Sequence, residues 1–329
     1  FVSSNRIEEE GRGYVVDVGG AVTPLVSTRS YGRHVAFSRD GSVVAWVPFD
    51  RQDVIYLADV QTVSAPRTTV AFSGRIGVYD FLDLAGSGRY LLVDNALYDV
   101  AGRQGVDGDR PLAALEPETY SVWDFELTAD ANVAYVVAGG WYEPSVSVER
   151  WDMRTGRRTR SWRVPIESEG AVDVAFALGD RPLVAIDSKE TVLVDLRTGE
   201  ELLRLDSWDM GSTAVALSSD GSSLASNFDV DFVRVVDVES GEVLWEEEYG
   251  LNAASLAFSP DGRFVVASGR TNETKVYDVA SGWLLREIPS GKTYDVMHFA
   301  PTGHHLIVGP DLRWFDLRIG EFVDSPYTY

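Results

Sequence analysis

Residues 253–287 read AASLAFSPDGRFVVASGRTNETKVYDVASGWLLRE, and their alternation of short apolar runs with turn residues decides the fold. Four β-prone runs are separated by segments rich in Gly, Pro, Asp, Asn and Ser. This pattern predicts a four-stranded antiparallel meander. The runs are Ala254–Ser259, Phe264–Ser268, Lys275–Val279 and Trp283–Ile288, the last of which continues just past the quoted stretch.

The third run carries an aspartate between apolar residues, and this short motif recurs along the whole chain. Its copies stand 38 to 53 residues apart. Since 299 residues separate the first from the last, the average step is about 43, within the ~40–45 residues of a four-stranded propeller blade. Each copy precedes a turn, where a carboxylate accepts backbone N–H groups, so we expect a structural role. The eight copies are Asp17, Asp59, Asp99, Asp152, Asp195, Asp237, Asp278 and Asp316.

These repeats predict an all-β fold, a single β-propeller domain over residues 1–329 with eight four-stranded blades. Residues 1–27 match only the second to fourth strands of a blade, so we expect its innermost strand near Tyr327–Tyr329. Such a split blade, 1–27 plus 324–329, closes the ring without an open edge. The alternative is seven blades with an N-terminal hairpin. The full repeats are expected at about 33–66, 78–112, 122–164, 171–206, 212–248, 253–289 and 293–323.

Two details resemble a known family. Phe258-Ser259-Pro260-Asp261-Gly262 followed by Tyr277-Asp278, and the Trp151-Asp152 pair, are similar to repeats of the WD40 superfamily of β-propellers. The similarity covers essentially the whole chain. It implies the fold more than an activity, because propellers host unrelated functions. The Gly-His pair that opens many family repeats is missing here, so the resemblance is to a divergent bacterial type.

Composition excludes several classes of function. Lys and Arg total 29 against 51 Asp and Glu, and the net charge of −22 opposes binding to nucleic acid or anionic lipid. Cysteine is absent, which excludes disulfides and thiolate chemistry. The 26 Arg against 3 Lys indicate a GC-rich bacterial genome or a salt-adapted surface. Localisation is left open between the bacterial cytoplasm and export. The chain begins at Phe1 without Met, so we expect a trimmed or partial chain.

The residues of the loops predict a binding surface. In a propeller, loops between second and third strands share one face, here called the loop face, with the loops that link successive blades. Aromatic and acidic residues gather on it, and aromatic loop residues are typical anchors of recognition surfaces. We therefore expect a non-catalytic scaffold or sensor that binds a basic or neutral protein or peptide, as a monomeric domain without cofactor or metal. The expected contact residues are Trp141, Tyr142, Glu143, Trp208, Asp209, Phe228 and Tyr249.

Two other functions stay open. A propeller enzyme, such as a lactonase-like hydrolase or a dehydrogenase subunit, needs a His, Arg and carboxylate cluster at the mouth of the central channel. A small-molecule or ion binder would use the channel itself. Ser290-Gly291-Lys292-Thr293 does not indicate a nucleotide site, because Arg286 stands where a phosphate-binding loop needs glycine. The candidate channel residues are His34, His298, Asp124, Asp173 and Asp295.

The opposite face, here called the turn face, has short turns. It carries the one basic cluster of the sequence, Arg154–Arg163, which we interpret as the exposed side of a strand pair. Its one long loop is expected from Ala101 to Pro111.

Overall fold

The computed structural model is all-β in the residues that it describes. No helix in this part of the chain is long and apolar enough to cross a membrane. The structure describes residues 14–16, 22–24, 35–37, 43–47, 53–59, 68–73, 82–85, 88–93, 96–101, 105–114, 121–128, 130, 132–140, 143–166, 172–206, 214–228, 232–248, 253–269, 273–289, 297–299, 304–308 and 313–323.

From residue 121 onward, the described strands form one four-stranded antiparallel sheet after another, and strands adjacent in sequence are adjacent in the sheet. The first of these sheets contains β12 (Ser121–Leu127), β13 (Val133–Gly139), β14 (Val146–Asp152) and β15 (Arg157–Val164). The second contains β16 (Asp173–Leu178), β17 (Pro182–Asp187), β18 (Glu190–Asp195) and β19 (Glu201–Asp206). The next is β20 (Val215–Leu217), β21 (Ser223–Phe228), β22 (Phe232–Asp237), β23 (Val243–Glu248). The last two are β24 (Ala253–Phe258), β25 (Phe264–Gly269), β26 (Glu273–Asp278), β27 (Leu284–Pro289), and β28 (Met297–Phe299), β29 (His305–Val308), β30 (Arg313–Asp316), β31 (Glu321–Val323).

The N-terminal part follows the same plan with one addition. A hairpin of β1 (Tyr14–Val16) and β2 (Val22–Pro24) precedes the first larger sheet. That sheet contains β3 (Val35–Phe37), β4 (Val43–Trp46), β5 (Val54–Asp59) and β6 (Thr68–Ala71), and the next contains β7 (Leu82–Ala85), β8 (Tyr90–Val93), β9 (Ala96–Asp99) and β11 (Ala113–Ala114). The addition is β10 (Val106–Asp107). It lies between β9 and β11 in the sequence but pairs in parallel with β6 of the preceding sheet.

This two-residue strand lies within the long loop predicted from Ala101 to Pro111, so that loop is not irregular throughout. Gly108 N–H donates to the carbonyl oxygen of Ala71 at 2.6 Å, and the Ser73 hydroxyl donates to Asp109 Oδ1 at 3.0 Å. The Tyr98 hydroxyl donates to the carbonyl oxygen of Gly108 at 2.7 Å, which ties β10 to its own sheet. The segment therefore covers the outer edge of the preceding sheet and joins two sheets.

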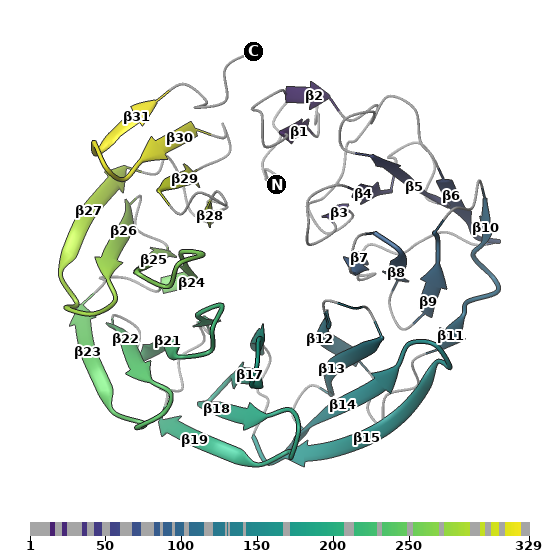
Figure 1. Cartoon of the computed structure of the whole chain (residues 1–329), viewed down its shortest axis with the longest axis horizontal. Coiled ribbons are helices and arrows are strands. Elements are labelled where there is room, and N and C mark those ends of the chain that lie inside the picture. Colours follow the sequence, from purple (N-terminus) through teal and green to yellow (C-terminus); the bar gives the residue numbers. More distant parts are fainter. Residues whose placement is uncertain are drawn as a thin grey trace.

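The sheets stand around a common centre, as Figure 1 shows. Strands such as β3, β7, β12, β24 and β28 lie near the centre, and β15, β19, β23, β27 and β31 lie on the perimeter. The hairpin of β1 and β2 lies between the last sheet and the first larger one. The arrangement is propeller-like, with radially ordered antiparallel sheets.

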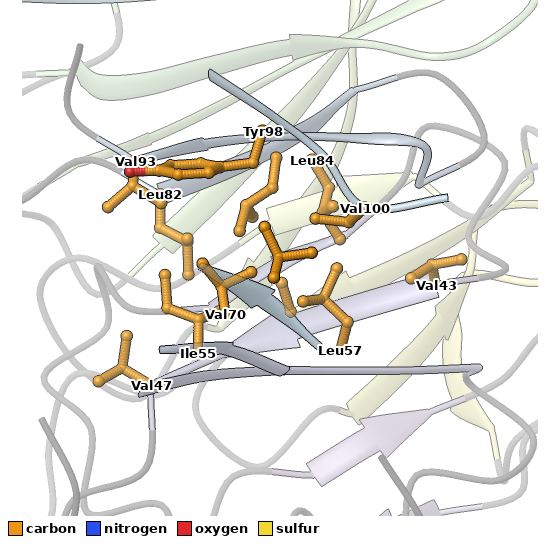
Figure 2. Close-up of a cluster of buried hydrophobic side chains, with 13 residues drawn as sticks. Val43, Val47, Ile55, Leu57, Val70, Leu82, Leu84, Val93, Tyr98 and Val100 are labelled. Atoms are coloured by element: carbon orange, nitrogen blue, oxygen red, sulfur yellow. The ribbon is translucent and has the colours of Figure 1, made fainter. Parts of the chain in front are cut away.

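Apolar side chains fill the space between consecutive sheets. Figure 2 shows one such cluster, in which Ile55, Leu57 and Val70 of one sheet meet Leu82 and Tyr98 of the next. Similar clusters lie between the later pairs of neighbouring sheets. Because a middle strand is covered on both faces, its sequence is a continuous apolar run, as in β17, where Leu183 to Ile186 are buried.

The perimeter strands are built differently. In β15, β19, β23 and β27 the pairing register skips one residue, which is the mark of a β-bulge. These strands also carry exposed charges, as in Glu246 to Glu248 of β23. Bulges and charges both protect an edge strand against pairing with another chain. The skipped residues are Thr159, Leu202, Leu244 and Leu285.

Candidate interaction surfaces

The repeated aspartates bind their own turns. Asp278 Oδ1 accepts the backbone N–H and the hydroxyl of Ser281 at 2.9 and 2.7 Å, while its carbonyl oxygen accepts Gly282 N–H at 2.9 Å. Asp237 makes the same contacts with Ser240 and Gly241. The carboxylates of four further copies also accept a backbone N–H two residues ahead, namely Asp99, Asp152, Asp195 and Asp316. These carboxylates are therefore used in shaping the turns, and Asp17 lies outside the described residues.

Most of the predicted contact residues fall outside the part that the structure describes, namely Trp141, Tyr142, Trp208, Asp209 and Tyr249. Phe228 ends β21, where its backbone pairs with Phe232. Glu143 is exposed at the end of the Gly139–Pro144 insertion. Its side chain lies against Gly140, because a Cβ atom added there would be 2.8 Å from Glu143 Cγ.

The described margin of the loop face is acidic with an exposed aromatic ring. Phe232 begins β22 and pairs with Glu248, and both side chains are exposed. On the preceding sheet, Glu190 pairs with Asp206, which is also exposed. Strand register thus gathers three acidic residues and one aromatic ring at the same end of two neighbouring sheets, and Arg204 is ion-paired with one of the three, Glu190.

Behind this margin lies a pair of acids on neighbouring strands. Asp173 begins β16, Asp187 ends β17, and the two residues face each other in the register. Asp173 Oδ2 accepts Val215 N–H of the next sheet at 2.8 Å. Asp173, a predicted channel residue, thus connects two sheets, and burial raises the pKa of its carboxyl.

Asp187 is the more deeply buried of the two, with no exposed surface. Its Oδ1 accepts the Thr191 hydroxyl at 2.6 Å, while Oδ2 has no hydrogen-bond partner among the described residues. Burial raises the pKa of Asp187 to about 7, and the Asp173 carboxyl adds to that rise. Arg234 of β22 lies near enough to oppose it. Burial lowers the pKa of Arg234 itself. The Arg234 guanidinium donates to Ser226 Oγ at 3.1 Å and to the Asp206 carbonyl oxygen at 2.6 Å.

The other predicted channel residues do not form a cluster within the described part of the chain. Asp124 Oδ1 accepts Phe125 N–H at 2.8 Å. His34 and Asp295 lie outside the described residues, and His298 is placed only as backbone of β28. Within the described ranges, no group of three or more His, Asp or Glu is arranged to hold a metal ion.

On the turn face, the basic cluster contains an ion pair between a buried acid and a partly exposed base. Glu149 of β14 has no exposed surface and accepts Arg158 Nη1 at 2.9 Å and Trp151 Nε1 at 2.9 Å. Arg160 donates to the Arg197 carbonyl oxygen of the next sheet at 2.8 Å. Part of the Arg154–Arg163 cluster therefore stabilises the sheets.

The last three sheets differ, because they expose apolar groups at the turn face. Large apolar side chains are exposed around the turns between third and fourth strands, and Trp283 is 75% exposed. We call this set the apolar ridge: Val243, Leu244, Trp283, Leu284, Ile319 and Phe322.

Sequence reasoning missed Asp187, Glu149 and the apolar ridge. Asp187 ends an apolar run and Glu149 follows a β-prone one, so each resembles a strand terminus that reaches solvent. A comparison of the repeats could have indicated the ridge from sequence. Trp283 stands directly after the turn glycine, where other repeats have Arg157, Glu200, Glu242 and Glu321.

Neither the protein-family models nor the curated proteins contain a match to this chain. The structure shows an all-β, propeller-like arrangement of repeated antiparallel sheets.

Proposed function

We propose that the chain is a non-catalytic scaffold or sensor that binds a protein or peptide at its loop face. The observation that carries the proposal is the exposed pair of Phe232 and Glu248 beside Glu190 and Asp206. An exposed aromatic ring supplies apolar contact area, and neighbouring carboxylates select a partner by charge. Glu143 adds an exposed carboxylate in the insertion after β13.

We further propose an eight-bladed ring related to the WD40 repeats. The hairpin of β1 and β2 would supply two strands of the eighth blade, and the segment near Tyr327–Tyr329 would supply its innermost strand. The place of the hairpin between the last sheet and the first larger one supports this proposal (Figure 1).

A peptide-array or pull-down experiment tests the proposed binding. The variants are Trp141→Ala, Trp208→Ala, Phe232→Ala and Glu143→Gln, compared with the wild type. We expect the aromatic variants to weaken binding by about tenfold or more, since an anchor residue typically contributes ~2 kcal/mol. Glu143→Gln should mainly slow association, and more so at low salt.

Leu112→Ser is the matched control, because Leu112 is an exposed apolar residue outside the loop face. A partner that binds all loop-face variants as tightly as the wild type would show that the loop face is not the binding surface.

A further inference from the structure

The apolar ridge is a local feature of three consecutive sheets. Directly after the turn glycine, the two preceding sheets have Arg157-Arg158 and Glu200-Glu201. The last three sheets have Glu242-Val243, Trp283-Leu284 and Glu321-Phe322. Since the turn recurs in the same form, these apolar residues occupy equivalent places along the perimeter near β23, β27 and β31 (Figure 1).

Phe322 is the ridge residue that reaches the core, because its ring packs edge-on against buried Phe315 with the ring centroids 5.2 Å apart. The junction beneath the ridge is closed by Trp245, whose buried indole donates from Nε1 to the Val279 carbonyl oxygen at 2.8 Å. Gly282 lies against the same ring. Trp283 directly follows Gly282 in the sequence and is the most exposed large apolar side chain of the described residues. Large apolar side chains that are exposed at the same turn of three consecutive sheets favour an interaction surface there.

Charge around the ridge is strongly negative. Arg318 and Arg263 are exposed bases near these turns. The Arg318 guanidinium is bound to Asp316 at 2.7 Å, and the Arg263 guanidinium lies over the Phe264 ring at 5.2 Å. The surrounding acids disfavour an anionic lipid surface and, at a net charge of −22, a second copy of the chain. Apart from Glu248, which lies at the loop-face end of β23, the exposed acids of these perimeter segments are Glu239, Glu242, Glu246, Glu247, Glu287 and Glu321.

The mode of contact follows from the perimeter strands. The bulges at Leu244 and Leu285 interrupt the edges of β23 and β27, and the exposed acids of β23 extend along its length. These features oppose the addition of a further strand. A partner would therefore use side chains, with apolar groups on the ridge and cations beside the glutamates.

We infer that the apolar ridge is a second binding surface, separate from the loop face, for a positively charged polypeptide segment that carries apolar side chains. Apolar burial at Trp283 supplies most of the affinity, and the glutamates give charge selection and a dependence on salt.

The test uses a labelled synthetic peptide that alternates Lys and Leu, with affinity measured by fluorescence anisotropy at low and high salt. Two matched peptides replace every Lys by Glu or every Leu by Ser. We expect only the Lys/Leu peptide to bind well. Trp283→Ser should weaken its binding about tenfold or more, and Leu244→Ser severalfold. The double variant Glu246→Gln with Glu247→Gln should lose much of the salt dependence.

Three matched controls should stay within about twofold of the wild type. Leu112→Ser removes an apolar group that is equally exposed elsewhere. Glu200→Gln removes an acid at the polar turn of an earlier sheet. Trp141→Ala alters the loop face, so its binding separates this inference from the proposed function.

Three outcomes would overturn the inference. The Lys/Leu peptide could bind no tighter than the Glu/Leu peptide, or the ridge variants could bind like the wild type. Sedimentation could also reveal self-association that Trp283→Ser abolishes, which would make a second copy the occupant of the ridge.

Discussion

Trp245 of one sheet lies against Gly282 of the next, so closely that a Cβ atom added to the glycine would be 2.7 Å from the indole Cγ. The same contact recurs around the perimeter, between Gly199 and Trp162 and between Gly320 and Arg286. Each glycine has a positive φ, which other residues rarely adopt. In these three sheets, the turn that closes the outer hairpin thus also packs against the sheet before it.

Gly282→Ala should be strongly destabilising. The substitution places alanine at a φ of +73° and also forces the methyl group into the Trp245 ring. Gly262→Ala is the control, since its φ is +69° but its nearest neighbour would be 3.9 Å away. We expect a loss of about 1 kcal/mol at Gly262 from the backbone alone. Gly282→Ala should cost about 2–4 kcal/mol, as overpacking adds to it. Equal shifts of the urea midpoint would contradict this account.

Arg158→Ala should destabilise the chain more than Arg154→Ala. Arg158 neutralises Glu149, which has no exposed surface, whereas Arg154 is an exposed partner of Asp152 at 3.6 Å. Removing Arg158 leaves the buried Glu149 without its cation and costs about 1–3 kcal/mol, less than for a fully buried pair because Arg158 is partly exposed. An exposed pair contributes ~0–1 kcal/mol. Thermal unfolding of both variants gives the comparison. Equal stability losses would show that Glu149 is stabilised by its other donors.

The turns, the four-stranded sheets and their propeller-like arrangement could be predicted from the repeat, whereas a pairing found in one sheet alone could not. Asp278 and Gly282 form a turn from a few adjacent residues, so the repeat itself predicts it. The parallel pairing of β10 with β6 depends on a contact between Val106 and Val70, which no short-range pattern encodes.

The same distinction applies to the candidate sites. The acidic and aromatic character of the loop face follows from which residues occupy the loops. The burial of Asp187 depends instead on how β16, β17 and the next sheet meet, and Asp173 takes part in that junction. Composition alone cannot separate an acid that faces solvent from one enclosed between sheets.

Deleting residues 324–329 should lower stability if this segment completes the eighth blade. The deletion would leave an unpaired strand edge and expose apolar surface, at a cost of about 1–3 kcal/mol. The control replaces the segment by Gly and Ser residues of equal number, which keeps the length but removes the tyrosines. Thermal unfolding of both forms is the measurement. An unchanged melting temperature in both would favour seven blades with an N-terminal hairpin.

Asp187→Asn should stabilise the chain at neutral and alkaline pH but not in mild acid. The pKa of Asp187 is raised from 3.8 to about 7, so the folded chain holds a proton that the unfolded chain releases near pH 4. Folding stability therefore falls as pH rises from about 4 to 7, and the loss is complete above that range. At 1.36 kcal/mol for each pKa unit, it amounts to at most ~4 kcal/mol. The substituted amide would stay neutral throughout, and its side-chain oxygen can still accept the Thr191 hydroxyl.

Urea unfolding of the wild type and Asp187→Asn from pH 5 to pH 8 provides the measurement. The two curves should converge near pH 5 and separate toward pH 8, with some slope left in the variant because burial also raises the pKa of Asp173. Asp130→Asn is the control. Hydrogen bonds from Thr128 and Asn132 lower the pKa of Asp130 to about 2. Its contribution is therefore lost only as pH falls below 4, so this variant should run parallel to the wild type from pH 5 to pH 8. A constant difference between Asp187→Asn and wild type over that range would contradict the raised pKa of Asp187, because protonation would then not differ between the folded and the unfolded chain.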